Sequence, residues 1–308
     1  MKILVTGGAG FIGSHLVDSL VKSHDVTIID NLSTGKKENI NLHATFYNED
    51  LNDHEIIDNI FKKEKPEIIY HLAGQKDLRK SLENPYEDVK LNIMTSVNIF
   101  ELAKNNNVRH IIFSSSGGAI YGIPNELPIN ENHQTQPLSP YGCSKLAIEK
   151  YLNYYKNNHK IKFTILRFSN VYGPREDNNP ESGIVSIFLK KMFKNNTPII
   201  FGGNQTRDFV YIDDVIKACI LAQNDIESNI YNVGTQKETD IIEIFSKLNK
   251  YFKNKYEPDY KDHVKGEIKK NCLCNKKIKE NLGWVPTTSI DEGLDKTYCW
   301  FLKELNKK

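Results

Sequence analysis

The sequence predicts an α/β fold, a doubly wound parallel sheet with a smaller, interlaced C-terminal domain. Three observations predict it. Short β-branched runs alternate with amphipathic stretches through the first half of the chain, a glycine-rich turn follows the first run, and the alternation ends after Arg167. Strands that alternate with helices form right-handed βαβ units, whose parallel strands are buried on both faces.

Each expected strand is a short run rich in β-branched or aromatic residues: Ile3–Thr6, Val26–Asp30, Ala44–Tyr47, Ile68–Leu72, His110–Ser114 and Phe163–Arg167. The expected helices place apolar residues at helical spacing, over Gly13–Ser23, Glu55–Lys63, Tyr86–Asn105 and Pro140–Asn157. Later we expect a helix over Val210–Gln223, started by the Asp213-Asp214 turn, and a strand over Asn229–Val233. Residues 1–176, with about 205–233 returning to them, should form the first domain, and residues 177–308 the second.

Composition excludes several classes of protein. The 308 residues are 39% hydrophobic and 26% charged, which is typical of a globular protein with a core. The net charge of +2 is too balanced for a protein that coats nucleic acid. We expect no membrane span and no secretory signal, because the chain contains no long apolar run. Five cysteines, an odd number, favour a reducing cytoplasm over a disulfide framework, and the Cys272-Leu273-Cys274 motif without a second pair argues against structural zinc.

The glycine-rich turn Gly7–Gly13 directly follows the first expected strand and opens the first expected helix. Glycines allow a tight turn and a close approach of the backbone to a pyrophosphate, whose charge then sits at the helix N-terminus. A glycine-rich turn without a ligand is the alternative, which this strand–helix context disfavours. The pattern predicts a Rossmann dinucleotide site, with contacts from Gly7, Gly10, Phe11, Ile12 and Gly13.

The ends of the following strands supply further candidate cofactor contacts. Asp30 ends the second strand, where a carboxylate binds the adenosine ribose hydroxyls and repels the extra phosphate of NADP, so NAD is the expected cofactor. Asp50 follows the third strand, and N-capping of the next helix is an equally good interpretation of it. The remaining candidates are small, polar or strand-end residues beside these positions: Asn31, Ser33, Gly35, Leu51, Leu72, Ala73 and Gly74.

Tyr141 and Lys145 lie one helical turn apart on the expected helix Pro140–Asn157. A nearby ammonium group stabilises a tyrosinate, so we expect the pKa of the Tyr141 phenol to be lowered toward neutral pH. This spacing by itself is more often a surface pattern. It indicates a catalytic site here because the fifth expected strand ends in Ser114-Ser115-Ser116, which place hydroxyl groups at the sheet edge. Ser116, Tyr141 and Lys145 are therefore the candidate catalytic residues, Ser116 and Tyr141 also as substrate contacts.

Taken in order, the glycine-rich turn, the serine after strand five and the Tyr–Lys pair resemble the extended short-chain dehydrogenase/reductase family of sugar-nucleotide epimerases and dehydratases. The resemblance runs over nearly the whole chain. Further segments agree with it: His71–Gln75, Asn92, Ser114–Gly122, Arg167 with Asn170–Arg175, Arg207–Asp214 and Leu282–Trp284.

The residues after the strand-five serines separate the reactions of that family. Gly117-Gly118-Ala119-Ile120 lacks the acidic pair of the dehydratases and the glutamate of the decarboxylases, and it looks like the UDP-glucose 4-epimerase branch. The resemblance thus implies interconversion of UDP-glucose and UDP-galactose, and of the N-acetyl forms, by transient oxidation at C4 with NAD. Another family reaction on a nucleotide sugar, such as reduction or acid-sugar epimerisation, and a non-catalytic NAD-sensing protein are the alternatives.

The resemblance also implies roles for single residues. It assigns cofactor contacts to Lys76, Asn92, Ser114, Tyr141, Lys145 and Phe168. It assigns contacts with the UDP-hexose substrate to Asn170, Val185, Phe201 and Arg207, with an Arg207–Asp208 ion pair as the alternative for Arg207. It further implies a homodimer formed through helices such as Tyr86–Asn105 and Pro140–Asn157.

Two positions depart from the family pattern: Val264 stands where an arginine is usual, and Cys274 where an aspartate is usual. Aligning on Gly266-Glu267 puts Asn271 at the wall of the pocket near the sugar C2 substituent. A small amide there would leave room for an N-acetyl group. The alternative is that Asn271 lies in a surface loop.

Overall fold

A seven-stranded parallel sheet forms the centre of the protein, in the order β11-β6-β5-β4-β1-β2-β3. The computed structural model describes residues 1–176, 182–262 and 268–305. The chain winds outward from β1 to β3, then returns and winds the other way from β4. The carboxyl ends of β1 and β4 therefore enclose a topological switch point, where sheets of this kind bind ligands. The predicted α/β class is confirmed.

The strands lie close to the predicted runs: β1 Lys2–Thr6, β2 Asp25–Ile29, β3 Thr45–Tyr47, β4 Ile68–His71, β5 His110–Ser116, β6 Lys162–Phe168 and β11 Asn229–Val233. Within β1, Ile3 and Val5 belong to the core cluster on one face of the sheet, and Leu4 belongs to the cluster on the other. This alternation explains why an unbroken apolar run marks each strand. Asp30 stands just after β2, and β5 extends two residues beyond its predicted end, to Ser116.

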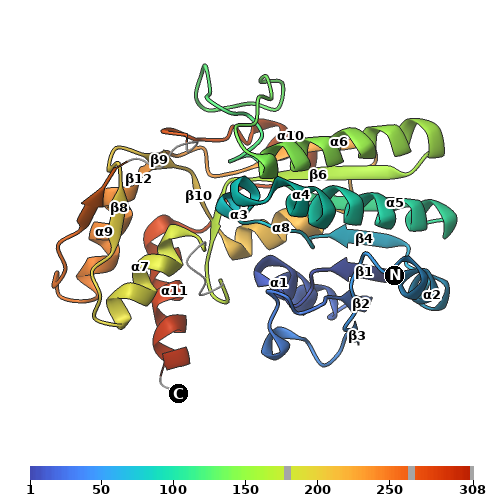
Figure 1. The fold of residues 1–308 in the computed structure, drawn as a ribbon, viewed down its shortest axis with the longest axis horizontal. Helices are drawn as coiled ribbons and strands as arrows, with labels where there is room; N and C mark the ends of the chain where they lie inside the picture. Colours follow the sequence, from blue (N-terminus) through green and yellow to red (C-terminus); the bar gives the residue numbers. More distant parts are fainter. Residues whose placement is uncertain (177–181, 263–267, 306–308) are drawn as a thin grey trace.

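Helices cover both faces of the sheet (Figure 1). α1 (Phe11–Leu20) packs against α8 (Ile212–Ala222) on one face, and α2 (His54–Glu64), α5 (Thr95–Asn105) and α6 (Pro140–His159) cover the other. Asp53 N-caps α2 by accepting from the backbone N–H of Ile56, and Ser139 caps α6 by accepting from Gly142. Both caps fix where the helix begins.

Two predicted helices differ from the structure. Tyr86–Asn105 is not a regular helix, because a π-helical turn, η2 (Lys90–Met94), separates α4 (Pro85–Val89) from α5. Val210–Gln223 is not helical from its start: Val210 pairs with Val171, so β10 (Phe209–Tyr211) runs parallel to β7 (Asn170–Tyr172), and α8 begins at Ile212. Pairing with a distant segment decided this boundary.

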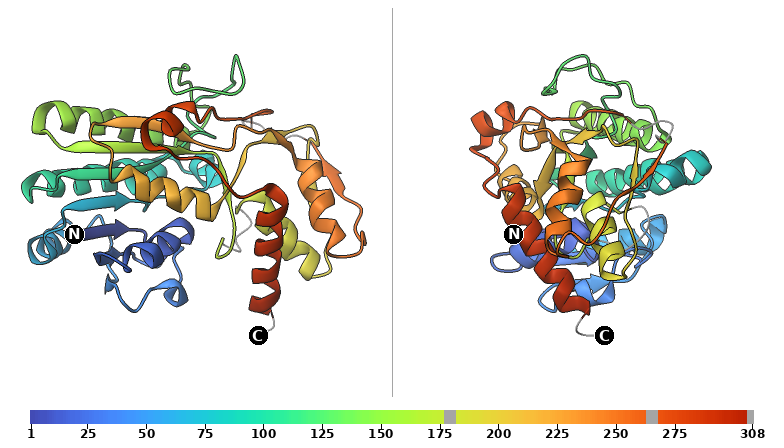
Figure 2. Two further views of the ribbon diagram at one scale, coloured as in Figure 1. Left: turned by 180° about the vertical axis from the view of Figure 1, so that it is seen from behind. Right: turned by 90° about the vertical axis from the view of Figure 1, so that its left-hand side faces the viewer.

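The second half of the chain builds a smaller lobe beside the carboxyl edge of the sheet (Figure 2). Its elements are α7 Ile184–Phe193, β8 Ile199–Phe201, β9 Thr206–Arg207, β12 Thr239–Asp240, α9 Ile241–Lys250, β13 Asp259–Lys261 and α11 Ile290–Leu305. Between them, α8, β11 and α10 (Lys276–Leu282) belong to the first lobe, where α10 packs against β11. Two short helices in the first half complete the fold, η1 (Lys37–Asn39) and α3 (Leu78–Glu83).

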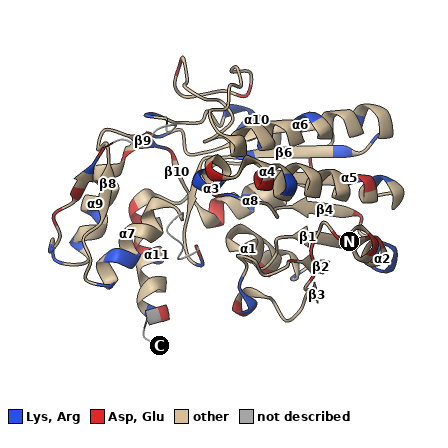
Figure 3. Ribbon diagram, in the orientation of Figure 1, with Lys and Arg blue, Asp and Glu red and all other residues tan. Residues whose placement is uncertain are grey.

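Acidic and basic residues are interspersed over both lobes (Figure 3). Many form local pairs on one helix, such as Lys62 with Asp58 and Lys296 with Glu292. Within the described ranges, none of the helices combines the length and apolar character needed to cross a membrane.

Candidate active site

A cleft of about 1390 Å³ lies along the carboxyl edge of the sheet, between the two lobes. Its lining comes from the glycine-rich turn, the ends of the central strands, the start of α6 and the segments after β6 and β8. Single small-molecule pockets usually measure about 300–1,000 Å³. The cleft is therefore large enough for a dinucleotide and a second ligand.

The glycine-rich turn brings the N-terminus of α1 to the cleft wall. Gly7 has φ +73°, and a Cβ there would lie 2.8 Å from the backbone nitrogen of Ala73. A Cβ on Gly13 would lie 2.1 Å from the carbonyl oxygen of Gly7. Gly7, Gly10, Phe11, Ile12 and Gly13 all line the cleft, so this turn forms a cradle that fits a pyrophosphate at a helix N-terminus.

Asp30 is held rigidly at the cleft wall. Its carboxylate accepts one hydrogen bond from the backbone N–H of Ala9 and one from Leu32, each at 2.9 Å. Gly35 packs against this carboxylate, where a Cβ would lie 2.7 Å from Oδ1. Asn31 and Ser33 line the cleft, and Gly35 stands behind Asp30 outside the lining.

Asp50 and Leu51 also line the cleft beyond Asp30. The capping interpretation of Asp50 is wrong, since Asp53 caps α2. Asp50 instead accepts from the backbone N–H of Asn52 at 2.8 Å and from the amide of Asn31. These hydrogen bonds lower the pKa of the Asp50 carboxyl, with the Asn52 backbone as the main cause.

The segment after β4 forms the floor of the cleft. Leu72, Ala73, Gly74 and Lys76 line it, as do Ser114 from β5 and Phe168 from β6. Asn92 does not line it: its side chain packs beneath Gly74, and its amide donates to Gln75 O and to Asp88. A direct cofactor contact by Asn92 is therefore not supported by the lining.

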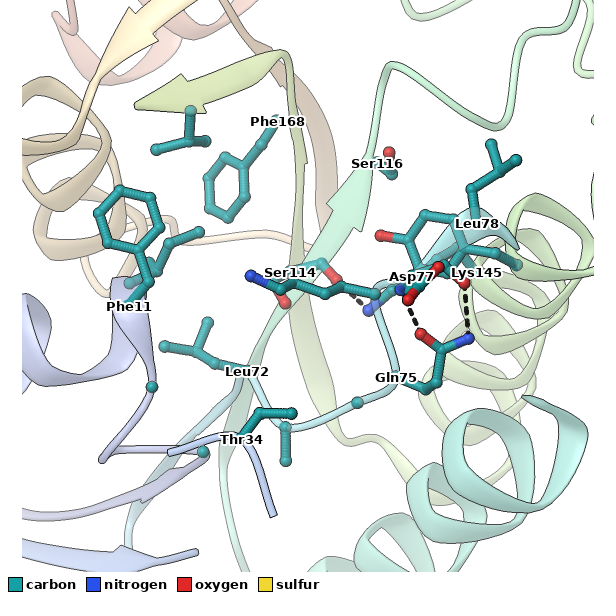
Figure 4. Close-up of a pocket in the computed structure, with 18 of the residues that line it drawn as sticks. Phe11, Thr34, Leu72, Gln75, Asp77, Leu78, Ser114, Ser116, Lys145 and Phe168 are labelled. Carbon is teal, nitrogen blue, oxygen red and sulfur yellow. Dashed lines mark hydrogen bonds between the residues drawn. The ribbon is translucent and has the colours of Figure 1, made fainter. Parts of the chain in front are cut away.

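Ser116, Tyr141 and Lys145 all line the cleft. Figure 4 shows Ser116 and Lys145 near the end of β5. The Ser116 hydroxyl lies near the Tyr141 phenol and favours its ionised form. Gly142 allows this approach, because a Cβ there would lie 2.5 Å from the carbonyl oxygen of Ala119. The Lys145 ammonium donates to the Ser114 carbonyl at 3.0 Å and lies 5.9 Å from the centre of the Tyr141 ring.

These side chains by themselves do not produce the predicted lowering of the tyrosine pKa, which also invokes the charge of a bound nicotinamide. Burial raises the pKa of Tyr141 to about 12, and the negative charge of Asp88 adds to this, against the effect of the Ser116 hydroxyl. The reason is geometric, since the Lys145 ammonium is turned toward the Ser114 carbonyl rather than the phenol. Burial also lowers the pKa of Lys145 to about 8, opposed by the negative charges of Asp88 and Glu149.

His71 stands behind this group and is fully buried. It is hydrogen-bonded to Thr6 Oγ1 at 2.8 Å and to Ser96 Oγ at 2.9 Å. Burial, with the positive charge of Lys145, lowers the pKa of His71 to about 3. His71 is therefore neutral at physiological pH.

The second lobe supplies the candidate substrate contacts. Asn170, Val185 and Arg207 line the cleft. Arg207 donates to its own lobe's carbonyls at Thr206 and Lys269. The Asp208 carboxylate, its alternative partner, is fully buried and instead accepts hydrogen bonds from Thr235, Gln236 and Leu273.

Two other predicted contacts are not on the cleft lining. Phe201 lies beside it, with the guanidinium of Arg79 over its ring at 5.6 Å. Asn271 is fully buried, so the surface-loop alternative is wrong, and its amide donates to the Gly117 carbonyl at 3.1 Å. Val264 lies outside the described residues, and Cys274 follows the buried Leu273 that packs on Gly117.

Sequence reasoning missed several residues on the cleft, among them Gln75, Asp77, Arg79, Asp88 and Arg175. The first three follow β4 and stand at the carboxyl edge, where parallel sheets gather functional residues. That position was the available signal. Among the residues that the structure describes, no three His, Cys, Asp or Glu side chains are grouped so as to hold a metal ion.

Comparison with known proteins agrees with this geometry. Residues 3–234 match the model of the NAD dependent epimerase/dehydratase family. A Methanocaldococcus jannaschii protein, named provisionally as a UDP-glucose 4-epimerase, is 47% identical over 97% of each chain. The structure of a Thermotoga maritima UDP-glucose 4-epimerase with UDP-glucose superposes with a TM-score of 0.97, at 42% identity, covering 99% of this chain and 100% of that one. A Methanobrevibacter ruminantium UDP-N-acetylglucosamine 4-epimerase, in complex with UDP-N-acetylmuramic acid, superposes with a TM-score of 0.93, at 34% identity, over 98% of each chain.

The fold and the site thus define a Rossmann-type enzyme that uses a dinucleotide. The chain belongs to the NAD-dependent epimerase/dehydratase family. Its cofactor is NAD, and the glycine cradle and Asp30 are the features of this chain that fit it.

Proposed function

We propose that this enzyme interconverts UDP-glucose and UDP-galactose by transient oxidation at C4. The observation that carries the proposal is that Ser116 and Tyr141 line the same cleft at the end of β5, together with Lys145 and the glycine cradle. The similarity to UDP-glucose 4-epimerases over the whole chain supports it.

The proposed roles follow from the positions of the side chains. Tyr141 Oη removes the proton of the sugar 4-hydroxyl and later returns it, while Ser116 Oγ hydrogen-bonds the same oxygen. The glycine cradle and Asp30 would hold NAD⁺, which would supply the hydride acceptor for oxidation at C4 and the hydride donor for its reversal on the opposite face. Asn170 and Arg207 hold the diphosphate side of the substrate, for which the bidentate guanidinium of Arg207 is suited. Val185 and Phe201 are proposed to flank the uracil.

The absence of a carboxylate beside Ser116 favours epimerisation over related reactions. Gly118 and Ala119 line the cleft next to Ser116. Elimination of water would need an acid and a base beside the sugar C5–C6 bond, and Gly118 and Ala119 supply neither. The 4-keto sugar is therefore left to accept hydride again.

Product analysis tests the proposal. Purified protein incubated with UDP-galactose should form UDP-glucose with no net consumption of NAD. Finding NAD bound to the protein does not separate an enzyme from an NAD sensor, whereas product formation does. Absence of UDP-glucose at every substrate concentration would refute the proposed activity.

We also propose that N-acetylated UDP-hexoses are accepted. The 34% identity to a UDP-N-acetylglucosamine 4-epimerase supports this breadth, and Asn271, whose amide donates to the Gly117 carbonyl, is the residue that alignment places near the sugar C2 substituent. Rates on UDP-galactose and UDP-N-acetylgalactosamine should be compared for the wild type and Asn271→Tyr. A wild type that ignores the N-acetyl sugar, or a tyrosine variant that still accepts it, would exclude Asn271 as a determinant.

A cytoplasmic homodimer completes the proposal. The five cysteines are free thiols, as suits a reducing compartment. Large apolar side chains are exposed on the packed helices α4, η2 and α6: Tyr86, Val89, Met94, Tyr151 and Tyr154. Burial of such a surface against a second copy is the expected outcome.

A further inference from the structure

Asp88 is a buried carboxylate close to the site that none of the roles above uses. Its side chain belongs to α4, and the residue is only 1% exposed. Burying an ionised carboxylate is costly unless hydrogen bonds compensate for its lost hydration. The partners of Asp88 therefore indicate its role.

The hydrogen bonds of Asp88 connect two separate parts of the site. Oδ2 accepts from the hydroxyl of Ser144, at 2.6 Å, and Ser144 precedes Lys145 on α6. Oδ1 accepts from the amides of Gln75 and Asn92, each at 3.0 Å. Asp88 thus joins α6, the helix that carries Tyr141 and Lys145, to the Gly74–Asp77 segment that follows β4.

That segment is itself organised around Gln75. The Gln75 side chain also donates to the carbonyl of Asp77 at 2.8 Å and accepts from the Asp77 backbone N–H (Figure 4). Asp77 in turn N-caps α3 by accepting from Lys80 at 2.9 Å. Gly74, Gln75 and Lys76 line the floor of the cleft, so a shift at Asp88 would move both the floor and the helix.

We propose that Asp88 is a positioning residue for Tyr141 and Lys145. Its carboxylate holds α6 against the Gly74–Asp77 segment and places a negative charge beside these two side chains. The proposal deepens the proposed epimerase function and rests on it. Asp88 contacts neither reacting atom and acts through Ser144 and Gln75.

The charge of Asp88 has a definite sign of effect on both partners. It raises the pKa of Lys145, against the burial that lowers it, and so keeps the ammonium protonated near neutral pH. It also raises the pKa of Tyr141. The titratable and charged groups that face the pair from the packed elements are His71 on β4, Asp77 in the β4–α3 segment, Asp88 on α4 and Glu149 on α6.

Two variants separate the effect of the Asp88 charge from the effect of its hydrogen bond to α6. Asp88→Asn removes the charge at nearly constant shape, and Ser144→Ala removes the bond to α6 and leaves the charge. In the NAD-loaded enzyme, Asp88→Asn should move both limbs of the kcat–pH profile to lower pH by about one unit. The alkaline ultraviolet titration of tyrosinate, taken as the difference from the matching Tyr141→Phe protein to isolate one of the 15 tyrosines, should show the same shift without any turnover. Ser144→Ala should lower kcat about tenfold, with the profile in place.

The outcomes decide the matter. An unshifted profile and tyrosinate titration in Asp88→Asn would refute the electrostatic role. A wild-type kcat in Ser144→Ala would refute the positioning role of the Ser144–Asp88 hydrogen bond. This test does not depend on whether Asp88→Asn folds. A wild type without epimerase activity refutes the proposed function instead, while the tyrosinate titrations of wild type and Asp88→Asn still test the charge.

Discussion

The ammonium group of Lys145 donates a hydrogen bond to the backbone carbonyl of Ser114, at 3.0 Å. This bond anchors α6 to the end of β5 and holds the lysine ammonium 4.8 Å from the centre of the Phe113 ring. Ser116 lies two residues further along the same strand. The strand therefore fixes the lysine and presents the serine at the same time.

Replacing the proposed base should abolish most turnover. Tyr141→Phe removes the hydroxyl that exchanges the proton, so we expect kcat to fall by about 10²- to 10⁴-fold. NAD should remain bound, because the ring is retained. Tyr151→Phe, on the exposed side of the same helix, is the matched control and should be indistinguishable from wild type. Near-normal turnover in Tyr141→Phe would exclude the mechanism.

Activity should decline as the pH rises through about 8, where burial places the pKa of Lys145. Below that value the amine is protonated, with its positive charge 5.9 Å from the centre of the Tyr141 ring, and above it this charge is lost. Lys145→Met should lose at least as much activity as the tyrosine variant, and its remaining activity should not decline as the pH rises through about 8. Lys150→Met, an exposed neighbour on α6, should keep the wild-type decline. A wild-type profile that stays flat into the range where free lysine titrates would contradict the assignment.

The enzyme should bind NAD in preference to NADP because of Asp30. Like charges about 4 Å apart in an effective dielectric constant of about 20 repel by about 4 kcal/mol. Discrimination of tenfold or more is therefore expected, and Asp30→Asn should reduce it. Calorimetric titration with both cofactors measures the effect, and Asp25→Asn, at the exposed start of β2 and outside the cleft lining, serves as the control. Equal affinities in the wild type would remove the role given to Asp30.

Alanine at Gly13 should be far more damaging than alanine at Gly10. The new Cβ would lie 2.1 Å from the Gly7 oxygen at position 13, but 3.2 Å from it at position 10. Overpacking of this kind costs about 1–3 kcal/mol or more. The thermal unfolding temperature should fall in Gly13→Ala and stay near the wild-type value in Gly10→Ala. Similar behaviour of the two variants would mean that the turn relaxes more easily than its geometry implies.

The wild type should sediment as a dimer, and Tyr86→Glu should sediment as a monomer. Tyr86 is 80% exposed on α4, and a charge there would have to be buried in the proposed interface. Ile226→Glu, at an equally exposed apolar residue outside these helices, is the control and should remain dimeric. A monomeric wild type, or a dimeric Tyr86→Glu, would place the interface elsewhere or exclude it.

The sequence by itself determined the parts of the protein that depend on local pattern. Unbroken apolar runs predicted the parallel strands, and the glycines before α1 predicted the dinucleotide cradle, because only glycine tolerates those close approaches. Ser116, Tyr141 and Lys145 could be singled out because strand ends and helical spacing bring such residues to one edge.

Only the tertiary structure decided the properties that depend on distant neighbours. The strand at Val210 exists because Val171 pairs with it, and the raised pKa of Tyr141 arises from burial and from Asp88 on another helix. Asn92 and Asn271 looked like ligand contacts, but their amides bind Gln75 and Gly117 inside the protein. Packing between segments far apart in the chain determines the partners and the desolvation of each side chain, and the spacing of residues along the sequence does not predict that packing.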